Sequence, residues 1–126
     1  MLVPLQAADG TPLAIAGTFA IFALFLSVTA HIAARNVLGD VPIRNGFLIG
    51  PVPAAVSIIV STFAASDAIL FGGLLVAIVL DGLAIGYVYG ESRTLSAYIT
   101  LIHFVVSVIL GTVLVGVWLL ATSAPA

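Results

Sequence analysis

The sequence predicts an all-α integral membrane protein, a bundle of four antiparallel transmembrane helices, and its composition and the spacing of its charges are the basis of that prediction. Of the 126 residues, 63% are hydrophobic and 6% are charged, and the mean hydropathy is +1.37. A soluble domain carries roughly 25% charged residues. So few charges cannot cover a folded chain of 12.8 kDa in water, so most of its surface must face hydrocarbon.

Four apolar segments alternate with short connections. The first is free of formal charge as far as Arg35. The stretch 47–89 would extend about 65 Å as one helix, about twice the thickness of a bilayer's hydrocarbon core, so it must turn back on itself. Ser66 or Asp67 can cap the helix that follows this turn, and Gly90 can end that helix. We therefore predict a single domain, residues 1–126, with spans at about 13–35, 47–65, 68–89 and 95–120.

The arginines predict the orientation of the chain. Arg35 and Arg44 flank the first connection and Arg93 lies in the third, whereas the second connection and both ends of the sequence have no basic residue. Basic residues concentrate in cytoplasmic loops. We expect a multi-pass protein of the cell membrane with both termini outside.

Several functional classes are disfavoured. The chain has no cysteine, which excludes disulfides and thiolate metal sites, and its net charge of −2 offers no basic surface, so we expect no nucleic-acid partner. No phosphate-binding loop, zinc-protease motif or nucleophile elbow is present. We therefore expect no cofactor and no catalytic residue, and thus no enzyme. In the hydrolase alternative, Ser107 would be the nucleophile and His103, four residues earlier, its base.

Small and polar residues recur at helical spacing in every span, which is how helices pack in lipid. In the third span this pattern consists of Gly82, Gly86 and Gly90. We expect these glycines to pack helices within the bundle, with contacts between copies of the chain as the alternative.

Asp81 requires a partner, because it lies roughly 13 Å from the predicted inner end of its helix, too deep for a short side chain to reach water. His103, His31 and Arg35 fall in the same half of the membrane. Three hypotheses remain open. The first is a structural pair between Asp81 and Arg35 or a protonated histidine. The second is exchange of protons or a cation between Asp81 and a histidine. The third is a metal site of His31, His103 and Asp81, although no spacing selects a metal.

Two parts of the chain carry a resemblance. The stretch Thr29-Ala30-His31-Ile32-Ala33-Ala34-Arg35, its continuation to Gly50-Pro51-Val52-Pro53, and the later His103-Phe104-Val105-Val106-Ser107 are similar to small four-span membrane proteins of salt-loving archaea. These proteins are grouped as a domain of unknown function. The resemblance covers nearly the whole chain, implies a single-domain protein of the archaeal cell membrane and assigns no role to any residue.

The functional prediction is a non-enzymatic membrane module, either an accessory subunit or a binder of small ligands, with a buried polar layer around Asp81. The alternative is a proton- or cation-coupled transporter or channel, built from several copies. The expected partners are the lipid bilayer and either another membrane protein or further copies of this chain.

Overall fold

The computed structural model describes residues 11–123, and all the regular structure in that part of the chain is helical. The helices are α2 (Pro12–Leu38), α3 (Ile43–Ile49), α4 (Pro51–Phe63), α5 (Asp67–Tyr89) and α6 (Arg93–Ser123). The α3–α4 pair forms one apolar segment, so four segments are long and apolar enough to cross a membrane. The all-α prediction is thereby confirmed for these residues. The ends of the predicted domain, residues 1–10 and 124–126, lie outside the described residues.

Local signals in the sequence explain where the helices begin and end. The Thr11 hydroxyl accepts a hydrogen bond from the Ala14 amide at the start of α2, and the Ser66 hydroxyl accepts one from Ile69 at the start of α5. Gly39 and Gly90 follow α2 and α5 with φ angles of 85° and 66°, which glycine adopts without steric cost. These signals make the connections between the long helices short.

The predicted second span has a break near its start. Gly50 lies between α3 and α4 with helical dihedral angles, and Pro51 follows it without a backbone N–H. A side chain at Gly50 would approach the Ser27 Cα to 2.6 Å. At Gly46, a Cβ would lie 2.6 Å from the Ser27 carbonyl oxygen. The two glycines therefore let this segment lie directly against the backbone of α2.

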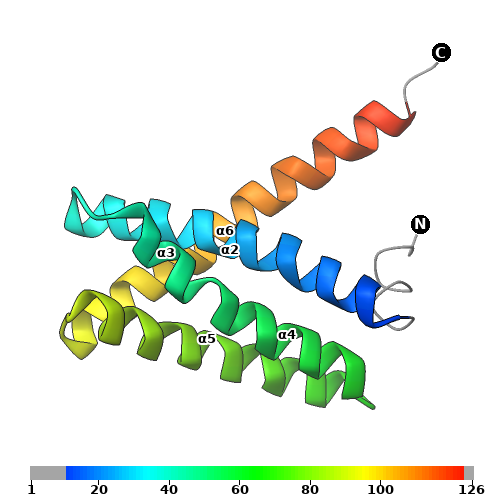
Figure 1. Ribbon diagram of the computed structural model, residues 1–126, viewed down its shortest axis with the longest axis horizontal. Helices are drawn as coiled ribbons and strands as arrows, with labels where there is room; N and C mark the ends of the chain where they lie inside the picture. Colours follow the sequence, from blue (N-terminus) through cyan, green and yellow to red (C-terminus); the bar gives the residue numbers. More distant parts are fainter. Residues whose placement is uncertain (1–10, 124–126) are drawn as a thin grey trace.

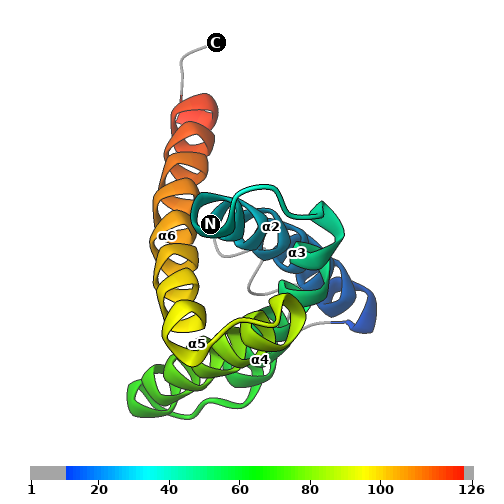
Figure 2. The same cartoon turned by 90° about the vertical axis from the view of Figure 1, so that its left-hand side faces the viewer.

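The long helices form a ring in which α2 packs on α4, α4 on α5, α5 on α6, and α6 on α2. Figure 1 shows the ring from the side and Figure 2 shows it turned by 90°. The tightest packing is near the α2–α3 and α5–α6 connections, where Ala33, Ala34, Ile49, Ile85 and Ile99 are fully buried. This core holds together the ends of α2, α3 and α5 and the start of α6.

The C-terminal half of α6 does not follow the predicted compact bundle. It stands clear of the other helices in both views, and the most apolar 18-residue window of α6 has no buried residue. From Val113 to Leu120, seven of the eight side chains are large and apolar, and Val113, Leu114 and Val117 are more than half exposed. Helices pack closely in lipid through small residues, and Gly116 is the one small residue of this stretch.

The glycines of α5 have different roles. A Cβ at Gly82 would lie 3.0 Å from the Thr100 Oγ1, and one at Gly86 would lie 2.9 Å from the Ser96 Oγ, so both glycines permit close contact between α5 and α6. Gly90, which we expected to pack in the same way, would have nothing within 4 Å of a Cβ. That expectation is wrong, because Gly90 instead ends α5 in the left-handed conformation and its N–H bonds to the Gly86 carbonyl.

Candidate functional site

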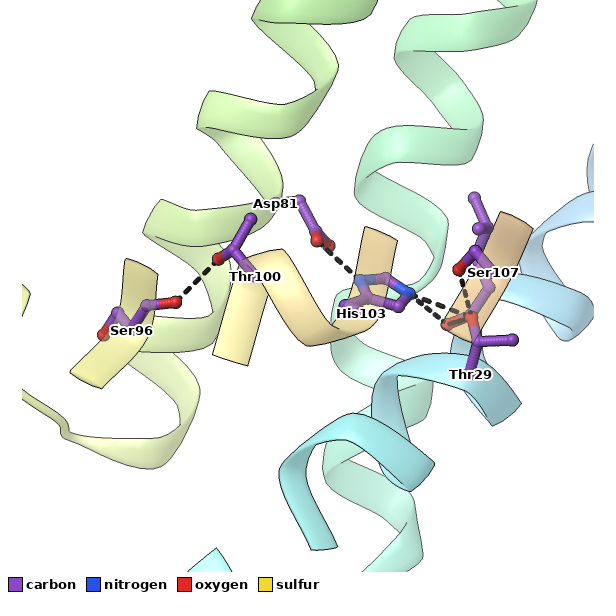
Figure 3. A network of polar contacts seen from close by, with 7 residues as sticks. Thr29, Asp81, Ser96, Thr100, His103 and Ser107 are labelled. Atoms are coloured by element: carbon purple, nitrogen blue, oxygen red, sulfur yellow. Dashed lines mark hydrogen bonds and ion pairs between the residues drawn. The ribbon is translucent and has the colours of Figure 1, made fainter. Parts of the chain in front are cut away.

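The packing of α5 on α6 brings Asp81 and His103 together. The Asp81 Oδ2 lies 2.6 Å from the His103 Nδ1, and the two side chains are only 7% and 3% exposed. Figure 3 shows the carboxylate of α5 pointing at the imidazole ring of α6. Asp81 lies four residues before Ile85, a member of the buried core, so the pair borders that core in the interior of the protein.

The other ring nitrogen of His103 faces α2. The Nε2 lies 3.1 Å from the Leu26 carbonyl oxygen and 2.9 Å from the Thr29 Oγ1. The Thr29 hydroxyl donates to the same Leu26 carbonyl at 3.1 Å and accepts a hydrogen bond from the Ser107 hydroxyl at 2.9 Å. The polar network therefore joins α5, α6 and α2 (Figure 3).

These contacts constrain the protons of the pair. A carbonyl oxygen can only accept, so the contact between Nε2 and Leu26 is a hydrogen bond only when Nε2 carries a hydrogen. The contact between Nδ1 and Oδ2 then needs one more hydrogen, which lies on Nδ1 or on Oδ2. Both arrangements leave Asp81 and His103 together without net charge. Neutrality lowers the cost of burying the pair.

The same constraint bears on the hydrolase alternative. Ser107 donates to Thr29, so the hydroxyl that approaches His103 belongs to Thr29. A histidine whose Nε2 already carries a hydrogen cannot take the proton of that hydroxyl. Asp81, His103 and Thr29 contact one another in the same order as the carboxylate, imidazole and hydroxyl of a catalytic triad. The hydrogen on Nε2 distinguishes this arrangement from such a triad.

Asp81 also borders a cleft among α2, α4, α5 and α6. The cleft has a volume of about 330 Å³, and Asp81 and His103 both line it. Its other walls are mainly apolar and include Phe22, Phe25 and Phe104. The second carboxylate oxygen of Asp81, Oδ1, is buried and has no hydrogen-bond partner among residues 11–123. Asp81 thus lines an apolar cleft and has one carboxylate oxygen that is buried without a partner.

A larger groove of about 610 Å³ runs between α5 and α6. Gly82, Gly86 and Ser96 line it, but Asp81 and His103 do not. We regard the smaller cleft as the candidate site, because the buried pair lies there, whereas the charged residues that line the larger groove, Glu91 and Arg93, are not buried.

Two of the predicted site residues lie elsewhere. Arg35 pairs with Asp40 at 3.5 Å, and both side chains are exposed, so the hypothesis that Arg35 neutralises Asp81 is wrong. Near the end of α2, Arg35 reaches solvent more readily than a buried partner. The Nδ1 of His31 is buried without a partner in the described part of the chain. No three His, Asp or Glu side chains gather there as metal ligands, so His31 does not join Asp81 and His103 in a metal site.

Sequence reasoning missed two members of the network, Thr29 and the Leu26 carbonyl. Thr29 is fully buried, and its position as a polar residue in an apolar span was the one signal that could have identified it. A backbone carbonyl leaves no trace in the sequence. Ser107 was predicted, but it contacts Thr29 instead of His103.

The fold and the site define a class: an all-helical protein with four segments apolar enough to cross a membrane and a buried carboxylate–imidazole pair between them. The chain belongs to the family of unknown function DUF7473, which matches residues 9–125. Comparison with curated proteins and with solved structures gives no significant match. The expected membership of a domain of unknown function is confirmed, and the archaeal source stays a prediction.

Proposed function

We propose that this chain is a multi-pass membrane protein that binds a small ligand in the cleft lined by Asp81 and His103, without catalysing a reaction. The observation that carries the proposal is an apolar cleft of about 330 Å³ that is lined by Asp81, a buried carboxylate whose Oδ1 has no partner among the described residues. Ligand sites are mostly apolar concavities with a few placed polar groups. An unsatisfied buried acceptor costs about 1–3 kcal/mol, which a ligand that donates a hydrogen bond recovers.

Two glycines of α6 supply a matched test. Gly111 lines the cleft, and a Cβ there would meet only Phe25, at 3.7 Å, whereas a Cβ at Gly116 would meet nothing within 4 Å. The change Gly111→Leu therefore fills part of the cleft, and Gly116→Leu adds the same side chain outside it. We would extract each protein gently from its native membrane and weigh it by native mass spectrometry.

The binding proposal predicts a small-molecule adduct on the wild type and on Gly116→Leu that is absent from Gly111→Leu. An equal adduct on all three, or none on the wild type, would overturn it. The same spectra report on partners: a stoichiometric second protein would instead favour an accessory subunit.

The proposed orientation places both termini outside the cell membrane, because the basic residues Arg35, Arg44 and Arg93 flank the α2–α3 and α5–α6 connections. Since the natural chain has no cysteine, Asp40→Cys and Ala65→Cys each introduce a single thiol, in the first and second connections. A membrane-impermeant maleimide added to intact cells should label the Ala65→Cys variant alone. Labelling of Asp40→Cys alone would reverse the orientation.

A second candidate function is proton- or cation-coupled transport. The buried carboxylate with a free oxygen favours it, because carboxylates of this kind mark ion pathways in membranes. Transport predicts that purified protein in liposomes moves protons or a cation and that Asp81→Asn abolishes the movement while the protein stays folded. If protons and cations cross liposomes with the protein no faster than liposomes without it, transport is excluded.

A further inference from the structure

We propose that the cleft takes a protonated amine with an apolar body, and that its binding displaces one proton from the pair of Asp81 and His103. The inference rests on the proposed function, since it names the ligand class of the same cleft. It follows from three observations: the hydrogen that the Leu26 carbonyl requires on Nε2, the short contact between Nδ1 and Oδ2, and the unpartnered Oδ1.

The first step is the proton count. With a hydrogen fixed on Nε2, Asp81 and His103 share one further hydrogen and are neutral as a pair. Among residues 11–123, no other formally charged side chain lines the cleft. The other titratable or charged groups on the packed helices lie outside the cleft, and α4 carries none. They are His31 and Arg35 of α2, Arg44 of α3, Asp67, Tyr87 and Tyr89 of α5, and Arg93 and Tyr98 of α6.

The second step is the charge of the ligand. A cation added to a neutral pair would place one uncompensated positive charge in an apolar cleft, which is costly. If the Nε2 hydrogen leaves for water and the other hydrogen stays between Nδ1 and Oδ2, Asp81 is a carboxylate beside neutral His103, Nε2 accepts from the Thr29 hydroxyl, and the cation restores neutrality. The exchange is balanced: one ammonium enters and one proton leaves. The cleft then has the same net charge before and after binding.

The third step is the type of cation. An ammonium has three N–H donors, so it can donate to the carboxylate of Asp81, which lines the cleft. The cleft walls contain Phe22, Phe25 and Phe104, and aromatic faces attract organic cations. A sodium ion would need several oxygen ligands, and the hydroxyl residues that line the cleft, Ser57, Thr100 and Ser107, are outnumbered by its apolar residues. The walls therefore favour an amine with an apolar body.

The test is calorimetry on the purified full-length chain in detergent, with cyclohexylammonium as the probe and empty micelles as the blank. Cyclohexanol supplies the same body without the charge, and sodium chloride supplies a charge without the body. Titrations at one pH in two buffers of different ionisation enthalpy report the number of protons released.

We expect cyclohexylammonium to bind with release of about one proton, and cyclohexanol and sodium to bind at least about tenfold more weakly. Asp81→Asn should bind the amine at least about tenfold more weakly and release no proton, while Gly116→Leu should match the wild type. Amine binding whose enthalpy is the same in both buffers would overturn the exchange. Failure of the amine to bind, or tighter binding of sodium, would overturn the ligand class. In each case an adduct lost only in Gly111→Leu would leave the proposed function standing.

Discussion

The Asp81 Oδ2 and the His103 Nδ1 lie 2.6 Å apart, and this contact joins the middle of α5 to the first half of α6 inside a largely apolar protein. The same imidazole reaches the Leu26 carbonyl of α2 through Nε2. One side chain thus links three of the four apolar segments. Both the stability and the proposed chemistry of the protein depend on it.

Asp81→Ala and His103→Ala should each cost about 3–5 kcal/mol of unfolding free energy, because each leaves a buried polar partner unpaired. The double variant should cost less than the sum, with a coupling of about 1.5–3 kcal/mol. Denaturant unfolding in detergent, followed by circular dichroism, measures all four proteins. Additive losses would show that the pair contributes no interaction of its own.

Thr29→Val should cost about 1 kcal/mol, because it removes the acceptor of the Ser107 hydroxyl while His103 keeps its bond to Leu26. Thr62→Val is the matched control. The Thr62 hydroxyl is exposed and bonds only to the Ile58 carbonyl of its own helix. The control should change stability by less than about 0.5 kcal/mol, and equal losses in the two variants would remove Thr29 from the network.

Gly50→Ala should destabilise the protein strongly, by about 3 kcal/mol or more, because its Cβ would collide with the backbone of Ser27 and push α2 away from the break between α3 and α4. Gly17 lies in α2, and a Cβ there would meet no atom of the described residues within 4 Å. Gly17→Ala should therefore be neutral or stabilise the protein by up to about 1 kcal/mol. Thermal unfolding of the two variants provides the comparison. A stable Gly50→Ala protein would contradict the close approach.

Gly90→Ala should cost about 1 kcal/mol, since Gly90 ends α5 at a φ of 66°. Gly90→Asn should cost less, because asparagine tolerates the left-handed conformation better than alanine. The melting temperatures of the two variants provide the measurement. A higher melting temperature for Gly90→Ala than for Gly90→Asn would contradict a left-handed conformation at the end of α5.

The helices could be predicted from the sequence because their causes are local. Long apolar segments, capping by Ser66 and the glycine at position 90 act within a few residues of one another. The break at Gly50 was harder to predict, because Gly50 has helical dihedral angles and its effect lies in contact with α2. The separation of the α6 C-terminus likewise depends on the absence of neighbours in space.

The site could be predicted only in part. Depth in the helix identified Asp81 as a residue in need of a partner, but it did not choose among His103, His31 and Arg35. That choice depends on how α5 is rotated against α6, where Gly82 and Gly86 allow the helices to meet. The periodicity of the sequence predicts which face of its own helix a residue occupies. Which other helix lies against that face depends on packing between the helices.

The position of the hydrogens on His103 tests the proposed neutral pair most directly. Because the chain has two histidines, His31→Gln leaves His103 as the single one, and ¹⁵N-histidine labelling followed by ¹⁵N NMR then reports on each ring nitrogen. Unfolding of the variant alongside the wild type provides the control. The neutral pair predicts a hydrogen on Nε2 and a second one shared between Nδ1 and Asp81. A hydrogen on Nδ1 with a bare Nε2 would contradict it.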